Sequence, residues 1–101
     1  AFWLLTLTNS NRLIGVSEIT TGTSKSVQIS PKLILQIALK ANAVGIIVAH
    51  NHPSGRLKIS ERDKKETQKL KLLAEKMEIT LLDHLIITSE SFLSFANRFM
   101  L

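Results

Sequence analysis

Residues 45–49, Gly-Ile-Ile-Val-Ala, form a short, continuous apolar run between two segments of helical periodicity. Such a run is typical of a central strand covered on both faces, because a strand with one wet face alternates apolar and polar residues. The first helix is expected to begin at Ser30-Pro31, a serine N-cap followed by proline at the first helical position. The second is expected over residues 60–77. A strand between two helices indicates an α/β fold.

The remaining segments supply further strands. Residues 2–8 and 12–20 are expected to form a hairpin around the turn residues 9–11. A long strand is expected at residues 79–88, and short strands at residues 27–29 and 91–96. With 101 residues, of which 45% are hydrophobic, the chain is long enough for one packed domain and too short for two. The prediction is one α/β domain with a mixed β-sheet flanked by helices.

Composition limits the compartment and the partners that this domain can have. The chain has no cysteine, which excludes disulfides and thiolate zinc sites and suits a reducing cytoplasm. No apolar run approaches the ~20 residues that a membrane span needs, so no membrane partner is expected. Because the first strand pattern begins almost at Ala1, the chain is expected to be the C-terminal domain of a longer protein. The formal charge of +5 suits an acidic partner such as nucleic acid, but a solvated basic surface explains it as well.

His50 and His52 follow the apolar run and are two residues apart. In an extended backbone they point to the same side, which provides half of a zinc site. The alternative is a pair of solvent-facing loop histidines. Asp63 favours the metal, because it begins a predicted inward helix stripe with Leu70 and Met77, and an inward carboxylate needs neutralisation. His50, His52 and Asp63 would bind zinc and leave a fourth position for water.

Two further residues are candidates for catalysis. Glu18 lies in an otherwise uncharged strand segment and is the candidate base for moving a proton from zinc-bound water. The alternative is an exposed strand position. Ser60 is a candidate hydrogen-bond donor to an oxyanion. Its alternative is a helix N-cap, since Ser60-x-x-Asp63 also has the pattern of a capping box.

The longer pattern H-x-H-P, six residues, S, two residues, D, from His50 to Asp63, resembles the JAMM motif of JAB/MPN-type zinc metallopeptidases. Residues 47–55 (IVAHNHPSG) and 82–87 (LDHLII) resemble the RadC family within that group. The likeness extends over nearly the whole chain. Asn51 departs from the serine or threonine of deubiquitinating members, and Ile59 from the proline that RadC relatives usually carry.

The resemblance implies a deaminase-like α/β fold and a zinc-dependent hydrolase of amide or isopeptide bonds in a peptide or protein. It implies one zinc ion held by His50, His52 and Asp63, with Glu18 as general acid and base and Ser60 stabilising the oxyanion. RadC proteins carry a DNA-repair name, and their substrate is unsettled.

A binding module for nucleic acid or protein, on an inactive scaffold of the same kind, is the alternative. Six cations crowd one loop and helix: Lys58, Arg62, Lys64, Lys65, Lys69 and Lys71. Glutamates interleave them and aromatic residues are few, which favours a solvated helix face over a phosphate-binding one. Asp83-His84, in an apolar strand, is interpreted as a structural hydrogen-bonded pair. Self-association is a further open alternative.

Overall fold

The computed structural model describes residues 2–20, 30–51, 59–98 and 100–101. In this part of the chain the elements are, in order, β1 (Phe2–Leu7), β2 (Leu13–Thr20), α1 (Pro31–Lys40), β3 (Gly45–Asn51), α2 (Glu61–Lys76), β4 (Thr80–Ile87) and β5 (Phe92–Ser94). The strands form one sheet of order β2-β1-β3-β4-β5. β3 and β4 are parallel and the other pairs are antiparallel, so the predicted mixed sheet in a single α/β domain is confirmed. The strand predicted at residues 27–29 lies outside the described residues.

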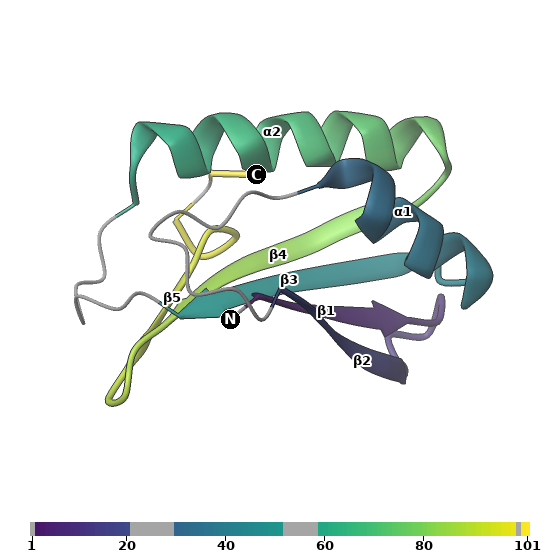
Figure 1. Ribbon diagram of the computed structural model, residues 1–101, viewed down its shortest axis with the longest axis horizontal. Coiled ribbons are helices and arrows are strands. Elements are labelled where there is room, and N and C mark those ends of the chain that lie inside the picture. Colours follow the sequence, from purple (N-terminus) through teal and green to yellow (C-terminus); the bar gives the residue numbers. More distant parts are fainter. Residues whose placement is uncertain (1, 21–29, 52–58, 99) are drawn as a thin grey trace.

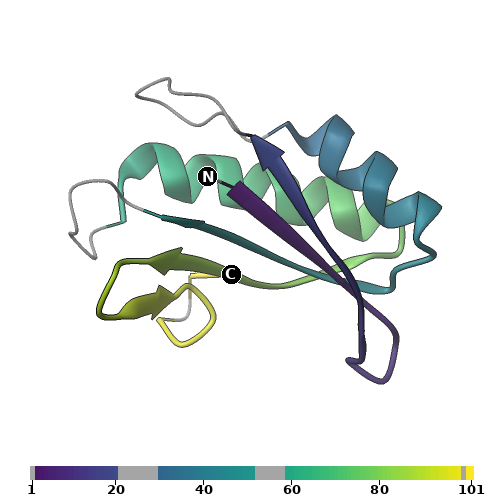
Figure 2. The same ribbon diagram turned by 60° about the horizontal axis from the view of Figure 1, so that its bottom comes forward.

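Both helices lie on the same face of the sheet, above it in Figure 1 and behind it in Figure 2. β3 is the central strand, as its apolar run predicts. The expectation that elements cover it on both faces is wrong for the described part of the chain, where the helices cover one face and Ile47 is only half-buried. The run is nevertheless apolar because β1 and β4 flank β3 on both edges and shield it.

α1 begins where local sequence chemistry predicts. The Ser30 side chain accepts a hydrogen bond of 3.3 Å from the backbone N–H of Leu33, and Pro31 occupies the first turn, where its missing N–H is not needed. Asn42, just after the helix, has a φ of 54°, a left-handed conformation that asparagine tolerates and that ends the helix.

α2 is longer and packs through a narrow stripe. Thr67, Leu70 and Ala74 are buried, and the rest of the helix is largely polar. Met77 is its C-cap and is 52% exposed, so the predicted inward stripe from Asp63 through Leu70 to Met77 fails at its C-terminal end. The helix ends at Lys76 and the chain turns there, which removes Met77 from the buried face.

The core lies between the sheet and the two helices. Its central residues include Phe2 and Leu4 from β1, Val48 from β3 and Leu70 from α2. A second cluster of Ile86, Leu93 and Phe95 closes the β4–β5 end. Leu101 packs against both clusters, and the buried polar residues include His50 in β3 and His84 in β4. In the described ranges, no helix is both long and apolar enough to cross a membrane.

Candidate metal centre

His50 lies near the C-terminal end of β3 and is 7% exposed. Its partner across the β1–β3 pairing is Phe2, and the two rings stack with a centroid distance of 6.2 Å and an interplanar angle of 14°. Phe2 belongs to the core under the helices. The imidazole is therefore held on the helix-covered face of the sheet, in a fixed plane, at the end of a rigid central strand.

A second histidine holds His50 from the neighbouring strand. Nδ1 of His50 lies 2.8 Å from Nε2 of His84 in β4, and Nδ1 of His84 lies 2.7 Å from the hydroxyl oxygen of Thr67 in α2. His84 and Thr67 are both completely buried. The His84 ring also stacks on Phe95, with centroids 4.5 Å apart. These contacts link three elements through one line of hydrogen bonds.

Sequence reasoning missed this line, because it paired His84 with its neighbour Asp83. The sequence signal was a histidine inside an apolar strand, and the register supplies its partner: His84 pairs with Val48 in the parallel β3–β4 pairing, so its side chain points to the same face as His50. A lone histidine in an apolar strand next to a strand that ends in histidine is the pattern to look for.

Asp83 is structural and hydrogen-bonded to His84, as predicted, and it has further partners in β5 and the turn after it. Its carboxylate accepts hydrogen bonds from the backbone N–H of His84 at 2.7 Å, the Ser94 hydroxyl at 2.5 Å and the Ala96 N–H at 3.1 Å. It thereby fastens β5 and the turn after it to β4. The predicted pair is joined through the backbone N–H of His84, and both side chains have further hydrogen bonds.

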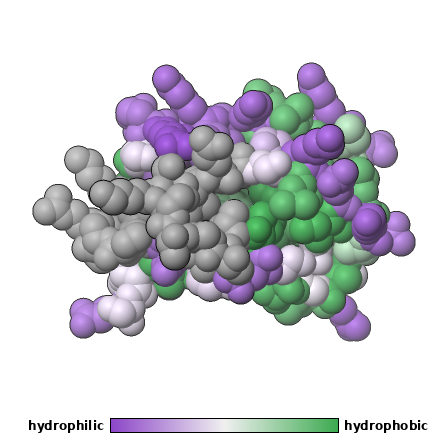
Figure 3. Space-filling view, viewed as in Figure 1, coloured by the Kyte–Doolittle hydropathy of each residue, from purple (hydrophilic) through white to green (hydrophobic). Residues whose placement is uncertain are grey.

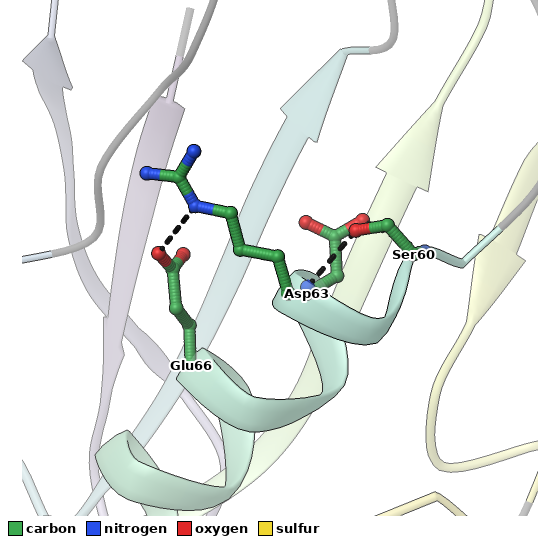
Figure 4. A network of polar contacts seen from close by, with 4 residues as sticks. Ser60, Asp63 and Glu66 are labelled. Atoms are coloured by element: carbon green, nitrogen blue, oxygen red, sulfur yellow. Dashed lines mark hydrogen bonds and ion pairs between the residues drawn. The ribbon is translucent and has the colours of Figure 1, made fainter.

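Ser60 and Asp63 form the predicted capping box at the start of α2 (Figure 4). The Ser60 hydroxyl accepts from the Asp63 N–H at 3.0 Å, and a carboxylate oxygen of Asp63 accepts from the Ser60 N–H at 3.3 Å. A carboxylate has two oxygens and about four acceptor positions, and a hydroxyl keeps its hydrogen when its oxygen accepts. The cap is therefore compatible with metal ligation by Asp63 and with hydrogen-bond donation by Ser60.

Glu18 is placed away from His50. Trp3 of β1 pairs with Glu18 in β2 and with Ala49 in β3, whereas Phe2 pairs with His50. Because side chains alternate along β1, this register puts Glu18 on the opposite face of the sheet from His50, and Glu18 is exposed. A register shift between Phe2 and Trp3 makes side-chain direction irregular at this point. The role of Glu18 as general base stays a prediction.

The predicted ligand set is described only in part. His50 and Asp63 are in the described residues, whereas His52 lies outside them. Across residues 2–20, 30–51, 59–98 and 100–101 there is no group of three or more histidine, cysteine, aspartate or glutamate side chains that could hold a metal. One of the three predicted ligands was outside that search, so the predicted triad is untested.

The chemistry of the three predicted ligands fits zinc. Two imidazole nitrogens and a carboxylate oxygen are a recognised set of zinc donors. The hydrogen bond to His84 uses Nδ1 of His50, so Nε2 is the nitrogen that a metal would meet. A ligating histidine characteristically has its other ring nitrogen held by a hydrogen bond in this way.

The mixed sheet has two helices on one face, a histidine near the end of β3 and a Ser-x-x-Asp sequence at the start of α2. This arrangement is consistent with a JAB/MPN fold. The family model described as "RadC-like JAB domain" matches residues 1–100. The chain therefore belongs to the RadC-like JAB domain family.

Curated relatives agree with this family. A "UPF0758 protein" of Flavobacterium johnsoniae is 38% identical over 97 residues, which cover 96% of this chain and 42% of that protein. A protein of the same name from Haemophilus ducreyi is 43% identical over 94 residues, covering 93% of this chain and 42% of that protein. One from Histophilus somni is 43% identical over 97 residues, covering 96% of this chain and 44% of that protein. The chain thus spans less than half the length of these relatives.

Proposed function

We propose that this domain is a zinc-dependent hydrolase of amide or isopeptide bonds in a peptide or protein. The observation that carries the proposal is the state of His50: a buried imidazole at a strand end, with one ring nitrogen already engaged by His84 and the ring plane held by Phe2. A ligating histidine characteristically has its other ring nitrogen held by a hydrogen bond in this way, which supports the proposal. Membership of a JAB domain family supports the same conclusion.

In this proposal His50, His52 and Asp63 would hold the metal. Zinc, when bound, would act as a Lewis acid toward a carbonyl and lower the pKa of a bound water to ~7. The capping box positions the Asp63 carboxylate at the first turn of α2, where backbone N–H groups also stabilise its charge. The chain contributes a rigid strand end and a fixed helix start as the two sides of the site.

Ser60 would stabilise the negative charge of the oxyanion, and Glu18 would transfer the proton. The Ser60 hydroxyl accepts a hydrogen bond from Asp63 and is exposed, so its own hydrogen can be donated to an oxyanion. Glu18 would accept a proton from the attacking water and return it to the leaving amine. Support for Glu18 comes from the motif resemblance alone, because the strand register does not bring it to the face of His50.

The second candidate function is a nucleic-acid-binding module, favoured by the charge of α2. Hydrophilic side chains gather over this helix at the top of Figure 3. Exposed ion pairs already use part of that charge: Arg62 lies 3.0 Å from Glu66, and Lys64 lies 3.1 Å from Glu61. A mixed, internally paired surface attracts phosphates less than a single-sign patch does, so the hydrolase is the leading proposal.

Metal content tests the proposed function directly. The wild-type chain and the variants His52→Ala and Asp63→Ala would be purified without chelators or a histidine tag, offered zinc, and measured by elemental analysis. Glu75→Ala, an exposed acid further along α2, is the matched control. We expect about one zinc per chain in the wild type and in the control, and much less in both ligand variants. Wild-type protein without zinc would overturn the proposal.

A further inference from the structure

The line of hydrogen bonds from His50 through His84 to Thr67 reaches from the candidate ligand into the core. We propose that His84, held by Thr67, is a positioning residue that determines which ring nitrogen His50 offers to the metal. This inference rests on the proposed zinc site and adds two residues that support it, His84 in β4 and Thr67 in α2.

Hydrogen counting explains the assignment. A neutral imidazole has one N–H and one bare nitrogen, so each ring in the line donates at one nitrogen and accepts at the other. His50 can ligate through Nε2 only when its hydrogen is on Nδ1 and is donated to His84 Nε2. The His84 hydrogen is then on Nδ1 and is donated to the Thr67 hydroxyl oxygen. The opposite order puts a hydrogen on Nε2 of His50 and prevents ligation.

Burial makes the two orders all-or-none. His84 and Thr67 are completely buried and His50 nearly so, so bulk water is not available to replace a lost partner within the line. A change at Thr67 is therefore expected to reach His50, because removing the acceptor of the His84 Nδ1–H disfavours the ligating order. The Thr67 hydroxyl serves as the terminal acceptor of the ligating order.

Aromatic packing holds the ring planes as well. Phe95 stacks on His84 at an interplanar angle of 13°, and Phe2 stacks on His50 at 14°. Stacking fixes both ring planes, and the 2.8 Å hydrogen bond between the two nitrogens fixes which way each ring faces within its plane. His84 therefore sets the direction of His50 as well as its tautomer.

The test compares zinc affinity in variants of nearly equal shape. Thr67→Val removes the hydroxyl and keeps the volume, whereas Thr67→Ser keeps the hydroxyl. His84→Gln keeps one donor and one acceptor, whereas His84→Leu removes both. Affinity would be measured by competition with a chromophoric zinc chelator. We expect Thr67→Val and His84→Leu to weaken zinc binding about 10- to 100-fold, the usual effect of losing such a support, and Thr67→Ser to stay close to wild type.

NMR of the ring nitrogens in the wild type shows which nitrogen of each histidine carries hydrogen. A purely structural role of His84 makes no prediction about that position. At about pH 8, above the ordinary histidine pKa of about 6.5, long-range ¹H–¹⁵N spectra report which nitrogen of each neutral ring carries hydrogen. In the zinc-loaded domain we expect both His50 and His84 to carry it on Nδ1. The measurement requires no variant, so it stands even where a substitution unfolds the chain.

The outcomes separate the two proposals. Zinc binding by the wild type, with Thr67→Val and Thr67→Ser equal in affinity, would overturn the role of His84 and leave the proposed function intact. Hydrogen on Nε2 of His84 in the zinc-loaded domain would do the same. A wild-type chain that binds no zinc would overturn both.

Discussion

The Ser60 hydroxyl oxygen lies 3.0 Å from the backbone nitrogen of Asp63, and the Asp63 carboxylate lies 3.3 Å from the backbone nitrogen of Ser60. Each residue therefore satisfies an N–H group that the start of α2 would leave unpaired. The same two side chains are the predicted oxyanion donor and the predicted third zinc ligand. Substitutions can separate the helix cap from the proposed chemistry. Glycine at position 60 and asparagine at position 63 each keep the cap and remove the group that the chemistry needs.

We expect Ser60→Gly to lose activity with little loss of stability. Glycine at an N-cap costs only a few tenths of a kcal/mol relative to serine, but it has no hydroxyl to donate. Removing an oxyanion donor typically lowers kcat about 100- to 1,000-fold. Ser60→Thr, which keeps the cap and the hydroxyl, is the control. Unfolding curves and turnover of a peptide found by screening would be measured; equal turnover in both variants would make Ser60 a cap alone.

Asp63→Asn is expected to keep α2 and lose zinc. The asparagine carbonyl still accepts the Ser60 N–H, so the cap persists, but the negative charge that a divalent ion needs is gone. Circular dichroism should show unchanged helix content, and elemental analysis should show a large drop in zinc. Asp63→Ala should lose both, with about 1 kcal/mol of stability. Full zinc content in Asp63→Asn would remove Asp63 from the ligand set.

Glu18→Gln tests the motif resemblance, which makes Glu18 the general base, against the strand register, which puts it on the opposite face from His50. If Glu18 moves the proton, zinc content should be unchanged and activity should fall about 100- to 10,000-fold. Glu75→Gln, an exposed acid on α2, is the matched control. Full activity in Glu18→Gln would show that Glu18, on the face of the sheet shared with Trp3, does not move the proton and that the base lies elsewhere.

Asp83→Asn is expected to loosen β5. The carboxylate accepts three hydrogen bonds, from His84, Ser94 and Ala96, and an amide has a single oxygen to offer them. Leaving one of these donors unpaired costs about 1–3 kcal/mol. Hydrogen exchange at residues 92–96 should accelerate more than at α1. Exchange rates that match those of Glu90→Gln, an exposed acid near β5, would contradict the fastening role.

The nucleic-acid alternative predicts a salt-dependent complex. A module that uses the α2 cations would bind duplex DNA at low salt and release it steeply as salt rises. Because two of those cations pair with glutamates of the same helix, we expect weak or undetectable binding. A mobility shift with steep salt dependence, abolished by Lys65→Glu with Lys69→Glu, would make the binding module the leading function.

Much of the fold was predictable from short stretches of sequence. The start of α1 and the capping box of α2 depend on residues at most three positions apart, so Ser30-Pro31 and Ser60-x-x-Asp63 specify them locally. The apolar run 45–49 identified the central strand for the same kind of reason. The prediction that Met77 faces inward was wrong because the inward stripe extends only as far as the helix. The C-terminus of a helix depends on the turn that follows.

The sequence by itself determined the kind of site: a histidine at the end of the central strand and a carboxylate in the first turn of a capped helix. Only the tertiary structure decided what supports it. His84 meets His50 across 34 positions of chain because the parallel register of β3 and β4 aligns them on one face, and Thr67 joins them because α2 crosses that face. Register and packing depend on all the strands and helices together, and no local pattern contains them.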